Sequence, residues 1–151
     1  MTFQQSRSRM REAENRPKAI LNHPDDAEKQ GIGAIRMTLD DIYMAEYTLE
    51  PGSEPGTPHY HARHSDTFYV LEGELEFVID GRLVRAAAGT VLTAPRGAIH
   101  AFPVAIGGRA RFLNLHTPGG FERYIRELTA MRSRGETPTD EFFRSHDQYN
   151  V

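Results

Sequence analysis

The chain has 151 residues, of which 26% are charged, and a formal net charge of -3. This length suits one domain with a substantial core. The acidic balance argues against a nucleic-acid surface, which normally needs a basic face, and no apolar stretch is long enough to cross a membrane. Because cysteine is absent, only histidine and acidic side chains remain as ligands for a transition metal. We therefore expect a cytoplasmic protein that binds neither nucleic acid nor membrane.

Strand-like patterns dominate the chain after a polar N-terminal arm, which we expect over residues 1–17. The clearest hairpin signal is the turn Glu72-Gly73, which lies between the strand-like runs 67–71 and 74–79. Asp80-Gly81 is a second turn signal. Short strands at close spacing predict an all-β sandwich or barrel, of which a jelly roll is one form. The predicted strands cover residues 32–38, 42–49, 67–71, 74–79, 82–86, 90–93, 99–104 and 110–117.

The pattern becomes helical after Gly120. Apolar side chains recur at helical spacing and form a stripe that we expect to dock on the barrel. On the wet face, two i,i+4 ion pairs are expected, Glu122–Arg126 and Arg123–Glu127. The apolar stripe consists of Phe121, Ile125, Leu128 and Met131.

Three of the seven histidines lie close together in the sequence, at positions 59, 61 and 64, just before Asp66. On an extended strand His59 and His61 point to the same side, because side chains alternate between faces. Two adjacent imidazoles form half of a metal site, since neutral imidazole binds Zn, Cu, Fe and Ni. A short polar cluster also occurs in loops that bind nothing, so a metal site requires a second segment. Residues 89–100, which end in His100, supply one.

These two segments resemble the two motifs of the cupin superfamily. The first motif, G-x5-H-x-H-x3,4-E-x6-G, is matched by Gly52, His59, His61, Asp66 and Gly73, with one extra residue before His59 and aspartate in place of glutamate. The second motif, G-x5-P-x-G-x2-H-x3-N, is matched by Gly89, Pro95, Gly97 and His100, with Val104 in place of asparagine. The stretch after His100 is also similar to small quercetin dioxygenase-like cupins.

The resemblance implies a single jelly-roll β-barrel over residues 18–118, with a helical extension over residues 119–151 packed on it. It also implies one divalent transition metal (Fe, Ni, Mn, Cu or Zn) inside the barrel. Carried over residue by residue, the metal ligands are His59, His61, Asp66 and His100.

Three roles stay open for the acid, because aspartate is one methylene shorter than glutamate. Asp66 can ligate the metal directly, it can orient a ligand imidazole from outside the first shell, or His64 can supply the fourth ligand in its place. The candidate catalytic groups are Asp66, His64 and His116. His116 either lines the cavity beside the metal or is satisfied by the backbone, whereas His23 and His146 are expected at the surface.

The function implied by the resemblance is a metal-dependent, dioxygenase-type oxidation of a small phenolic or enolic substrate. A non-oxidative ring closure or isomerisation, as in the cupins that act as polyketide cyclases, is the alternative within the same fold. Binding of a small molecule without turnover is the alternative of another class. We also expect a homodimer, as is common among small cupins.

Overall fold

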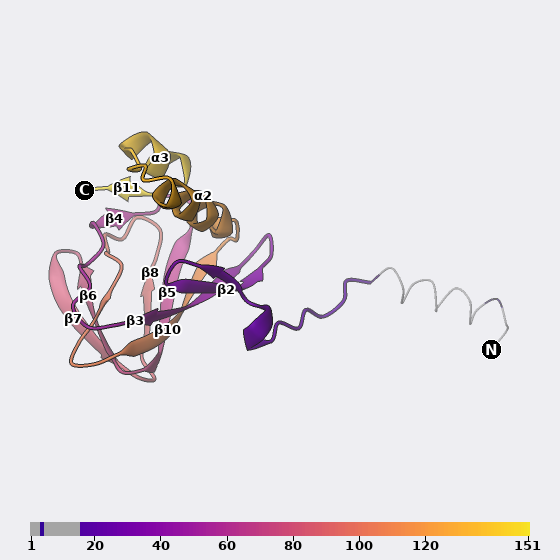
Figure 1. Ribbon diagram of the computed structural model, residues 1–151, viewed down its shortest axis with the longest axis horizontal. Coiled ribbons are helices and arrows are strands. Elements are labelled where there is room, and N and C mark those ends of the chain that lie inside the picture. Colours follow the sequence, from indigo (N-terminus) through magenta and orange to yellow (C-terminus); the bar gives the residue numbers. More distant parts are fainter. Residues whose placement is uncertain (1–3, 5–15) are drawn as a thin grey trace.

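The computed structural model describes residue 4 and residues 16–151, so the expected arm over residues 1–17 lies almost entirely outside the described part (Figure 1). Two helices cover one end of the strand body, and a six-stranded sheet, in the order β1-β2-β3-β10-β5-β8, forms one wall. A three-stranded sheet, β7-β6-β9, forms the other. The larger sheet contains β1 (Glu28–Gln30), β2 (Gly33–Thr38), β3 (Tyr43–Leu49), β5 (Ser65–Glu72), β8 (Val91–Ala94) and β10 (Ala110–Thr117). The remaining strands are β4 (His59–Tyr60), β6 (Glu74–Ile79), β7 (Arg82–Ala87), β9 (Val104–Ala105) and β11 (Tyr149–Asn150), and a 3-10 turn, η1 (Pro24–Asp26), precedes β1.

The central strands of the large sheet determine which side chains face the interior of the barrel. Strand β10 pairs antiparallel with β3 on one side and with β5 on the other, and both β3 and β10 alternate buried and half-buried positions along their length. This alternation is what a sheet with one packed face requires. Aromatic side chains fill the barrel, with Tyr47 stacked on Phe112 and Phe68 edge-on to Phe77. The buried core comprises Ile35, Tyr43, Ala45, Tyr47, Leu49, Phe68, Val70, Leu75, Phe77, Ala86, Ala105, Ala110 and Phe112.

The expected hairpin through Glu72-Gly73 is wrong, although both of its strands exist. Strand β5 pairs with β10 and β8, whereas β6 pairs with β7 and β9 in the other sheet. Gly73 is therefore the corner at which the chain passes from one sheet to the other, with a φ of 76°. A side chain there would meet the backbone of Arg109, so glycine is required by close packing as well as by its positive φ. The second predicted turn, Asp80-Gly81, does join β6 to β7 as a hairpin.

The predicted strand over residues 99–104 is shorter in the structure. Only Val104–Ala105 forms a regular strand, and His100 makes isolated bridges to His59 and to Ile79. Pro103, which has no backbone N–H, interrupts the ladder between them. The short bridges leave His100 at the inner face of the barrel.

The C-terminal extension contains α2 (Phe121–Ser133) and α3 (Asp140–Ser145). In α2, Leu128 is buried, and Phe121 and Ile125 pack against the core. Three members of the predicted stripe therefore face the interior, whereas the fourth, Met131, is only half-buried. Thr139 caps α3 through its hydroxyl, which accepts from the N–H of Phe142. No helix in the described part of the chain is long and apolar enough to span a membrane.

The two ion pairs expected within α2 do not form, because tertiary partners take their place. Arg126 binds Glu28 of β1 through both carboxylate oxygens, at 2.8 and 2.6 Å. Glu127 accepts from the ring of His146 at 2.9 Å. His146, expected at the surface, is only 9% exposed. These contacts tie α2 to the first strand and to the end of α3.

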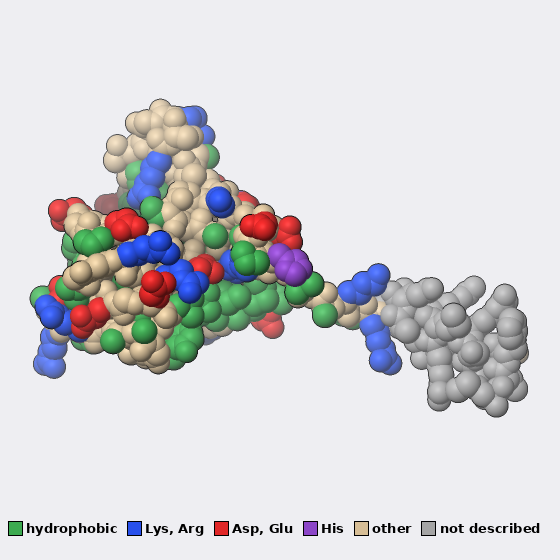
Figure 2. Space-filling model, turned by 60° about the horizontal axis from the view of Figure 1, so that its bottom comes forward, with side chains coloured by type: hydrophobic (Ala, Val, Ile, Leu, Met, Phe, Trp, Pro, Cys, Tyr) green, Lys and Arg blue, Asp and Glu red, His purple; other side chains and the backbone are tan. Residues whose placement is uncertain are grey.

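Several apolar side chains remain exposed on the described surface. Figure 2 shows one face of the molecule, on which hydrophobic side chains form a continuous area bordered by charged groups. Contiguous apolar surface of this kind often marks an interaction site. It is compatible with the expected homodimer, which stays a prediction. The exposed apolar side chains of the strands are Tyr69, Leu83, Val84 and Val91.

Replacing Leu128 by alanine tests whether α2 is an integral part of the fold. Because Leu128 is 7% exposed, we expect a loss of unfolding free energy of about 2–5 kcal/mol, which at this size lowers the melting temperature by roughly 2–4 °C per kcal/mol. The matched control is Leu83→Ala, where the side chain is 68% exposed and the loss should stay below about 1 kcal/mol. Thermal unfolding by circular dichroism measures both. Equal melting temperatures for the two variants would mean that α2 undocks independently of the barrel.

Candidate metal centre

Five buried histidines and Asp66 meet inside the barrel near the end that α2 covers. Strand pairing brings them together from distant parts of the sequence. His59 lies opposite His100 in an antiparallel bridge, and His116 of β10 lies opposite Asp66 of β5. Directly opposed residues have their Cβ atoms about 4.5–5.5 Å apart, so each pairing places two of the predicted site residues side by side, and the contact between His100 and Asp66 joins the two pairs.

His59, His61 and His100 form a group in which one ring nitrogen of each lies within 4.8 Å of the others. Their Nδ1 atoms donate to backbone carbonyls, of Thr57 for His59 at 2.8 Å and of Ala98 for His100 at 3.0 Å. His61 donates in the same way to the carbonyl of Asp147, at 2.8 Å. With the proton held on Nδ1, the Nε2 lone pairs of His59 and His61 are available to a ligand. Nε2 of His100 lies 3.2 Å from Oδ2 of Asp66 and would have to release its proton to bind a metal.

Burial keeps most of these imidazoles neutral. It lowers the pKa of His59 to about 4 and that of His61 to about 2. The pKa of His100 moves the other way: burial would lower it, but the hydrogen bond and the charge of Asp66 outweigh burial and raise it. Neutral imidazole is the metal-binding form. The Nε2 atom of His61 is buried and has no hydrogen-bond partner in the described protein, so the donor set fits a bound cation.

Asp66 supplies the negative charge of the cluster. Its Oδ2 atom lies 3.2 Å from Nε2 of His100, and its Oδ1 atom accepts a short hydrogen bond from the amide of Asn114. Burial alone would raise the pKa of this carboxyl, but the neighbouring imidazoles, His116 and then His100, outweigh burial and lower it. Asp66 is therefore an ionised carboxylate inside the barrel.

The shorter reach of aspartate is visible in this arrangement. Neither three-residue group of potential ligands contains Asp66, although its Oδ2 faces the same nitrogen of His100 that would bind a metal. The carboxylate thus lies at the edge of the histidine group. Because Asp66 contacts the nitrogen of His100 that would bind the metal, the carboxylate cannot orient this ring through Nε2 once a metal is bound, and direct ligation by Asp66 stays a prediction.

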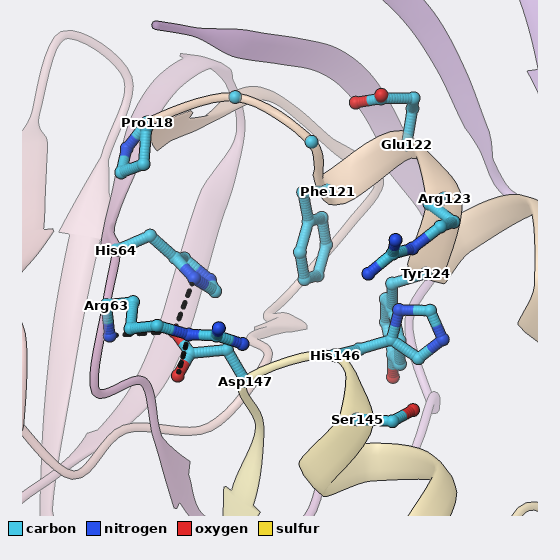
Figure 3. A pocket seen from close by; sticks show the side chains of 12 residues that line it. Arg63, His64, Pro118, Phe121, Glu122, Arg123, Tyr124, Ser145, His146 and Asp147 are labelled. Atoms are coloured by element: carbon cyan, nitrogen blue, oxygen red, sulfur yellow. Dashed lines mark hydrogen bonds and ion pairs between the residues drawn. The ribbon is translucent and has the colours of Figure 1, made fainter. Parts of the chain in front are cut away.

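His64 and His116 form a second group with His61, again with ring nitrogens within 4.8 Å of one another. The rings of His61 and His64 are stacked, with centroids 3.9 Å apart and an interplanar angle of 28°. Nδ1 of His64 lies 2.8 Å from Oδ2 of Asp147 (Figure 3), and its Nε2 is buried without a partner. The buried histidines therefore continue beyond His59, His61 and His100, and His64 brings the cluster into contact with Asp147 near the C-terminus.

His116 lines the cavity, as one of the two options for it expects, and its catalytic role stays a prediction. Its Nε2 lies 3.0 Å from Oδ1 of Asn114, its Nδ1 has no partner in the described protein, and its ring stacks on Phe121 at 3.7 Å. Burial lowers the pKa of His116 to about 3. His116 is consequently a neutral imidazole with one free nitrogen beside the metal-ligand group.

A cavity of about 460 Å³ opens onto this cluster, within the range of small-molecule sites. His59, His61 and Asp66 form its floor, and α2 supplies much of one wall. Aromatic and aliphatic side chains line the cavity together with about as many polar and charged ones. The wall residues include Tyr47, Phe102, Phe121, Ile125, Leu128, Asn114, Arg132 and Gln148.

Two site residues were not anticipated from the sequence. Asn114, 2% exposed, links Asp66 to His116; its signal is its place between Phe112 and His116 on the inward face of an alternating strand. Asp147 contacts the histidine segment from 83 to 86 positions away in the chain, and no local pattern marks it.

Comparison with known proteins agrees with the motifs. Residues 45–116 match the Cupin_2 family model, described as the cupin domain. Quercetin 2,3-dioxygenase of Bacillus subtilis is 27% identical over 97 residues, which make up 64% of this chain and 28% of that protein. An uncharacterized protein of Aquifex aeolicus is 42% identical over 43 residues, or 28% of this chain and 36% of that protein. The chain therefore matches roughly a third of the length of these curated relatives.

Solved structures share the architecture. KdgF from Halomonas sp. superposes with a TM-score of 0.62 at 22% identity, covering 70% of this chain and 99% of that chain. An RmlC-like cupin from Shewanella frigidimarina gives 0.61 at 20% identity, covering 70% and 96%. The polyketide cyclase RemF from Streptomyces resistomycificus gives 0.53 at 24% identity, covering 68% and 80%. Likeness at these identities shows the fold alone.

The two motifs, the opposed sheets and the inward-facing histidines define a cupin, a double-stranded β-helix with C-terminal helices. The chain is a Cupin_2 domain protein, distantly similar to quercetin 2,3-dioxygenase. The fold expected from the sequence is thereby confirmed.

Removing His59 or His100 tests the metal centre. We expect His59→Ala and His100→Ala to weaken binding of Zn²⁺ or Co²⁺ by more than the roughly 10–100-fold that loss of an outer-shell partner costs, because each removes one Nε2 donor. Isothermal titration measures the affinity, and mass spectrometry measures the metal that remains after dialysis. His23→Ala, at an exposed histidine, is the control and should bind as the unmodified protein does. Unchanged affinity in folded His59→Ala and His100→Ala would remove these residues from the ligand set.

Proposed function

We propose that this cupin is a metal-dependent enzyme that oxidises a small phenolic or enolic compound in a dioxygenase-type reaction. The observation that carries the proposal is the group of three histidines, His59, His61 and His100, two of which, His59 and His61, line the cavity. Three imidazoles, with or without Asp66, leave coordination positions free for a substrate, as catalytic rather than structural sites do. The distant similarity to quercetin 2,3-dioxygenase favours oxidation.

The metal would be held by His59, His61 and His100, with Asp66 adding charge beside them. When bound, it would supply Lewis-acid polarisation of a substrate oxygen. The cavity suits a flat aromatic ring that carries hydroxyl groups, because Phe121 and Phe102 can contact the ring and polar side chains are available to its hydroxyls. The identity of the divalent metal stays open among Fe, Ni, Mn, Cu and Zn, because imidazole accepts them all.

The chain's own acid–base groups would handle the substrate proton. His116 is neutral and keeps one ring nitrogen free, so it can accept a proton from a hydroxyl in the cavity. Asn114 connects it to the carboxylate of Asp66, which would stabilise the imidazolium that forms. His64, whose free Nε2 is also buried, is the second candidate for this role. General base catalysis of this kind typically contributes about 10²–10⁴-fold in rate.

The same groups support the alternative, a non-oxidative ring closure or isomerisation. Two neutral histidines with a free nitrogen each, His64 and His116, lie on one side of the ligand group. A pair of this kind can remove a proton at one atom and return it at another, which an isomerisation requires and a simple oxidation does not. This observation keeps the second reaction class in the proposal. Ligand binding without turnover is the remaining outcome.

The use of oxygen separates the two reactions. For the oxidative function we expect turnover of a phenolic or enolic substrate to consume oxygen, to stop in an anaerobic chamber and to depend on which metal is loaded, because Zn²⁺ has no redox chemistry. Oxygen uptake and product analysis, compared between iron-, nickel-, manganese-, copper- and zinc-loaded protein, provide the measurement. Equal turnover by the zinc-loaded protein without oxygen would establish the non-oxidative reaction instead. Binding without any product would overturn both.

Replacing Asp66 by asparagine tests the charge in the cluster. The variant keeps the size of the side chain but removes the carboxylate that neighbours His100 and, through Asn114, supports His116. We expect turnover to fall by about 10²–10⁴-fold. The pKa of His100 should fall as well, because burial alone would lower it once the charge of Asp66 is gone, and histidine NMR of the metal-free protein measures this. Asp41→Asn, at an exposed turn, should change neither. Full activity in Asp66→Asn would exclude the carboxylate from the reaction.

A further inference from the structure

The last six residues of the chain, 146–151, lie outside the matched cupin domain and yet contact both segments that carry the first two ligand histidines. We call these residues the C-terminal strap. Strand β11 of the strap pairs with β4, so that Asn150 lies opposite His59 and Tyr149 opposite Tyr60. The rings of Tyr149 and Tyr60 stack, with centroids 5.0 Å apart. The N–H of Val151 extends the pairing by donating to the carbonyl of Pro58 at 3.0 Å.

Asp147 makes the second attachment, to the segment that follows His61. Its carboxylate accepts from the backbone N–H of Ala62 at 3.2 Å and of Arg63 at 2.8 Å, and it lies 2.8 Å from Nδ1 of His64. The side chain of Arg63 adds a longer contact at 3.4 Å. Figure 3 shows this carboxylate reached from one side by His64 and Arg63. Asp147 is only 4% exposed, so these groups, rather than water, satisfy it.

The backbone of Asp147 makes the third attachment. Its carbonyl oxygen accepts from Nδ1 of His61 at 2.8 Å. The residue has a φ of 62°, a left-handed conformation that aspartate and asparagine adopt more readily than most residues. That conformation allows the carbonyl to meet His61 while the carboxylate turns to Ala62, Arg63 and His64. One residue thus fixes the proton position on two rings of the histidine cluster.

We propose that Asp147 is a positioning residue of the metal centre, and that the C-terminal strap completes that centre. The proposal rests on the metal site argued above. A ligand histidine binds metal best when its other ring nitrogen donates to a carbonyl or carboxylate, because this bond fixes both tautomer and ring orientation. His59 and His100 obtain this bond from residues two positions away, Thr57 and Ala98. His61 obtains it from the strap, so its alignment depends on the strap being docked.

Docking of the strap and metal binding are therefore coupled. If undocking of the strap lowers the metal affinity by some factor, because it releases Nδ1 of His61, then a bound metal must raise the equilibrium constant for strap docking by the same factor. The strap is also held by α2, because Glu127 of α2 contacts the ring of His146, the first residue of the strap. The helical extension consequently contributes to the metal site as well as to the cavity wall.

The test variant is Asp147→Asn, which keeps the size of the side chain and tolerates the positive φ but cannot accept hydrogen bonds on both of its terminal atoms. We expect Zn²⁺ or Co²⁺ affinity to fall by about 10–100-fold. In the metal-free protein, ¹⁵N-histidine NMR should show that His64, which contacts the carboxylate, loses its fixed Nδ1–H tautomer. His61, which is bonded to the backbone carbonyl of residue 147, should lose it as well, because weakened carboxylate contacts undock the strap that holds this carbonyl in place. Asp140→Asn, an exposed carboxylate on α3, is the matched control and should leave affinity and tautomers unchanged.

The tautomer measurement separates positioning from simple stabilisation. A purely structural role of Asp147 would lower the melting temperature while leaving the tautomers and the metal affinity of the folded variant unchanged, and that result would overturn the proposal. The NMR measurement is made without metal, so it tests the role of Asp147 independently of metal binding. If the unmodified protein binds no metal, that result overturns the proposed function and not the effect of Asp147 on the tautomers.

Hydrogen exchange on the unmodified protein gives a second test that needs no variant. Addition of Zn²⁺ should slow exchange at the amide of Val151, which lies in the strap and not among the ligands. The amide of Gly135, bonded to Arg132 at the end of α2, is the internal reference and should not change. Zinc binding that leaves the Val151 amide as exposed to exchange as before would contradict the coupling.

Discussion

The site depends on one repeated interaction, the hydrogen bond from Nδ1 of a buried histidine to a backbone carbonyl. It occurs at His59, His61 and His100. Each bond places the ring proton on the outside of the group and leaves Nε2 toward its centre. Because burial also holds His59 and His61 neutral, the protein prepares lone pairs for a cation in advance. Without these carbonyls, the same rings would be free to rotate or to exchange tautomers, and their donor atoms would not converge.

The barrel supplies this arrangement through pairing between distant strands. The bridge between His59 and His100 and the pairing of Asp66 with His116 place the reactive groups on one inner surface, while the aromatic core below them fixes the strands. Asp66 contributes the negative charge that raises the pKa of His100, and Asn114 transmits it to His116. The chemistry therefore follows from the sheet register, since a shift by one residue would turn these side chains to the outer face.

Much of this could be predicted from the sequence, because cupin motifs and strand alternation are local signals. The strand at 110–117, the turn at Asp80-Gly81 and the helix beginning at Phe121 agree with the structure. The hairpin at Glu72-Gly73 was wrong because a turn signal does not reveal whether the two strands stay in one sheet. His146 was placed at the surface because its partner, Glu127, comes from another element.

The same reasoning explains which parts of the site stayed out of reach. Asn114 lies on an inward position of a predicted strand, so its burial was predictable, but its bond to Asp66 depends on the pairing of β10 with β5. Asp147 depends on a tertiary contact that no periodicity encodes. Both residues act on histidines that the motifs do identify. The sequence thus predicts the donor atoms, and only the structure shows what orients them.

The central claim is that Nε2 of His59, His61 and His100 bind one metal ion. Anomalous diffraction from crystals soaked with Zn²⁺, measured on both sides of the zinc absorption edge, locates the ion directly. The account predicts one strong peak at about 2.0–2.1 Å from each of the three Nε2 atoms, with Nδ1 of each ring still bonded to its carbonyl. A peak centred instead among His61, His64 and His116, or no peak inside the barrel, would contradict it.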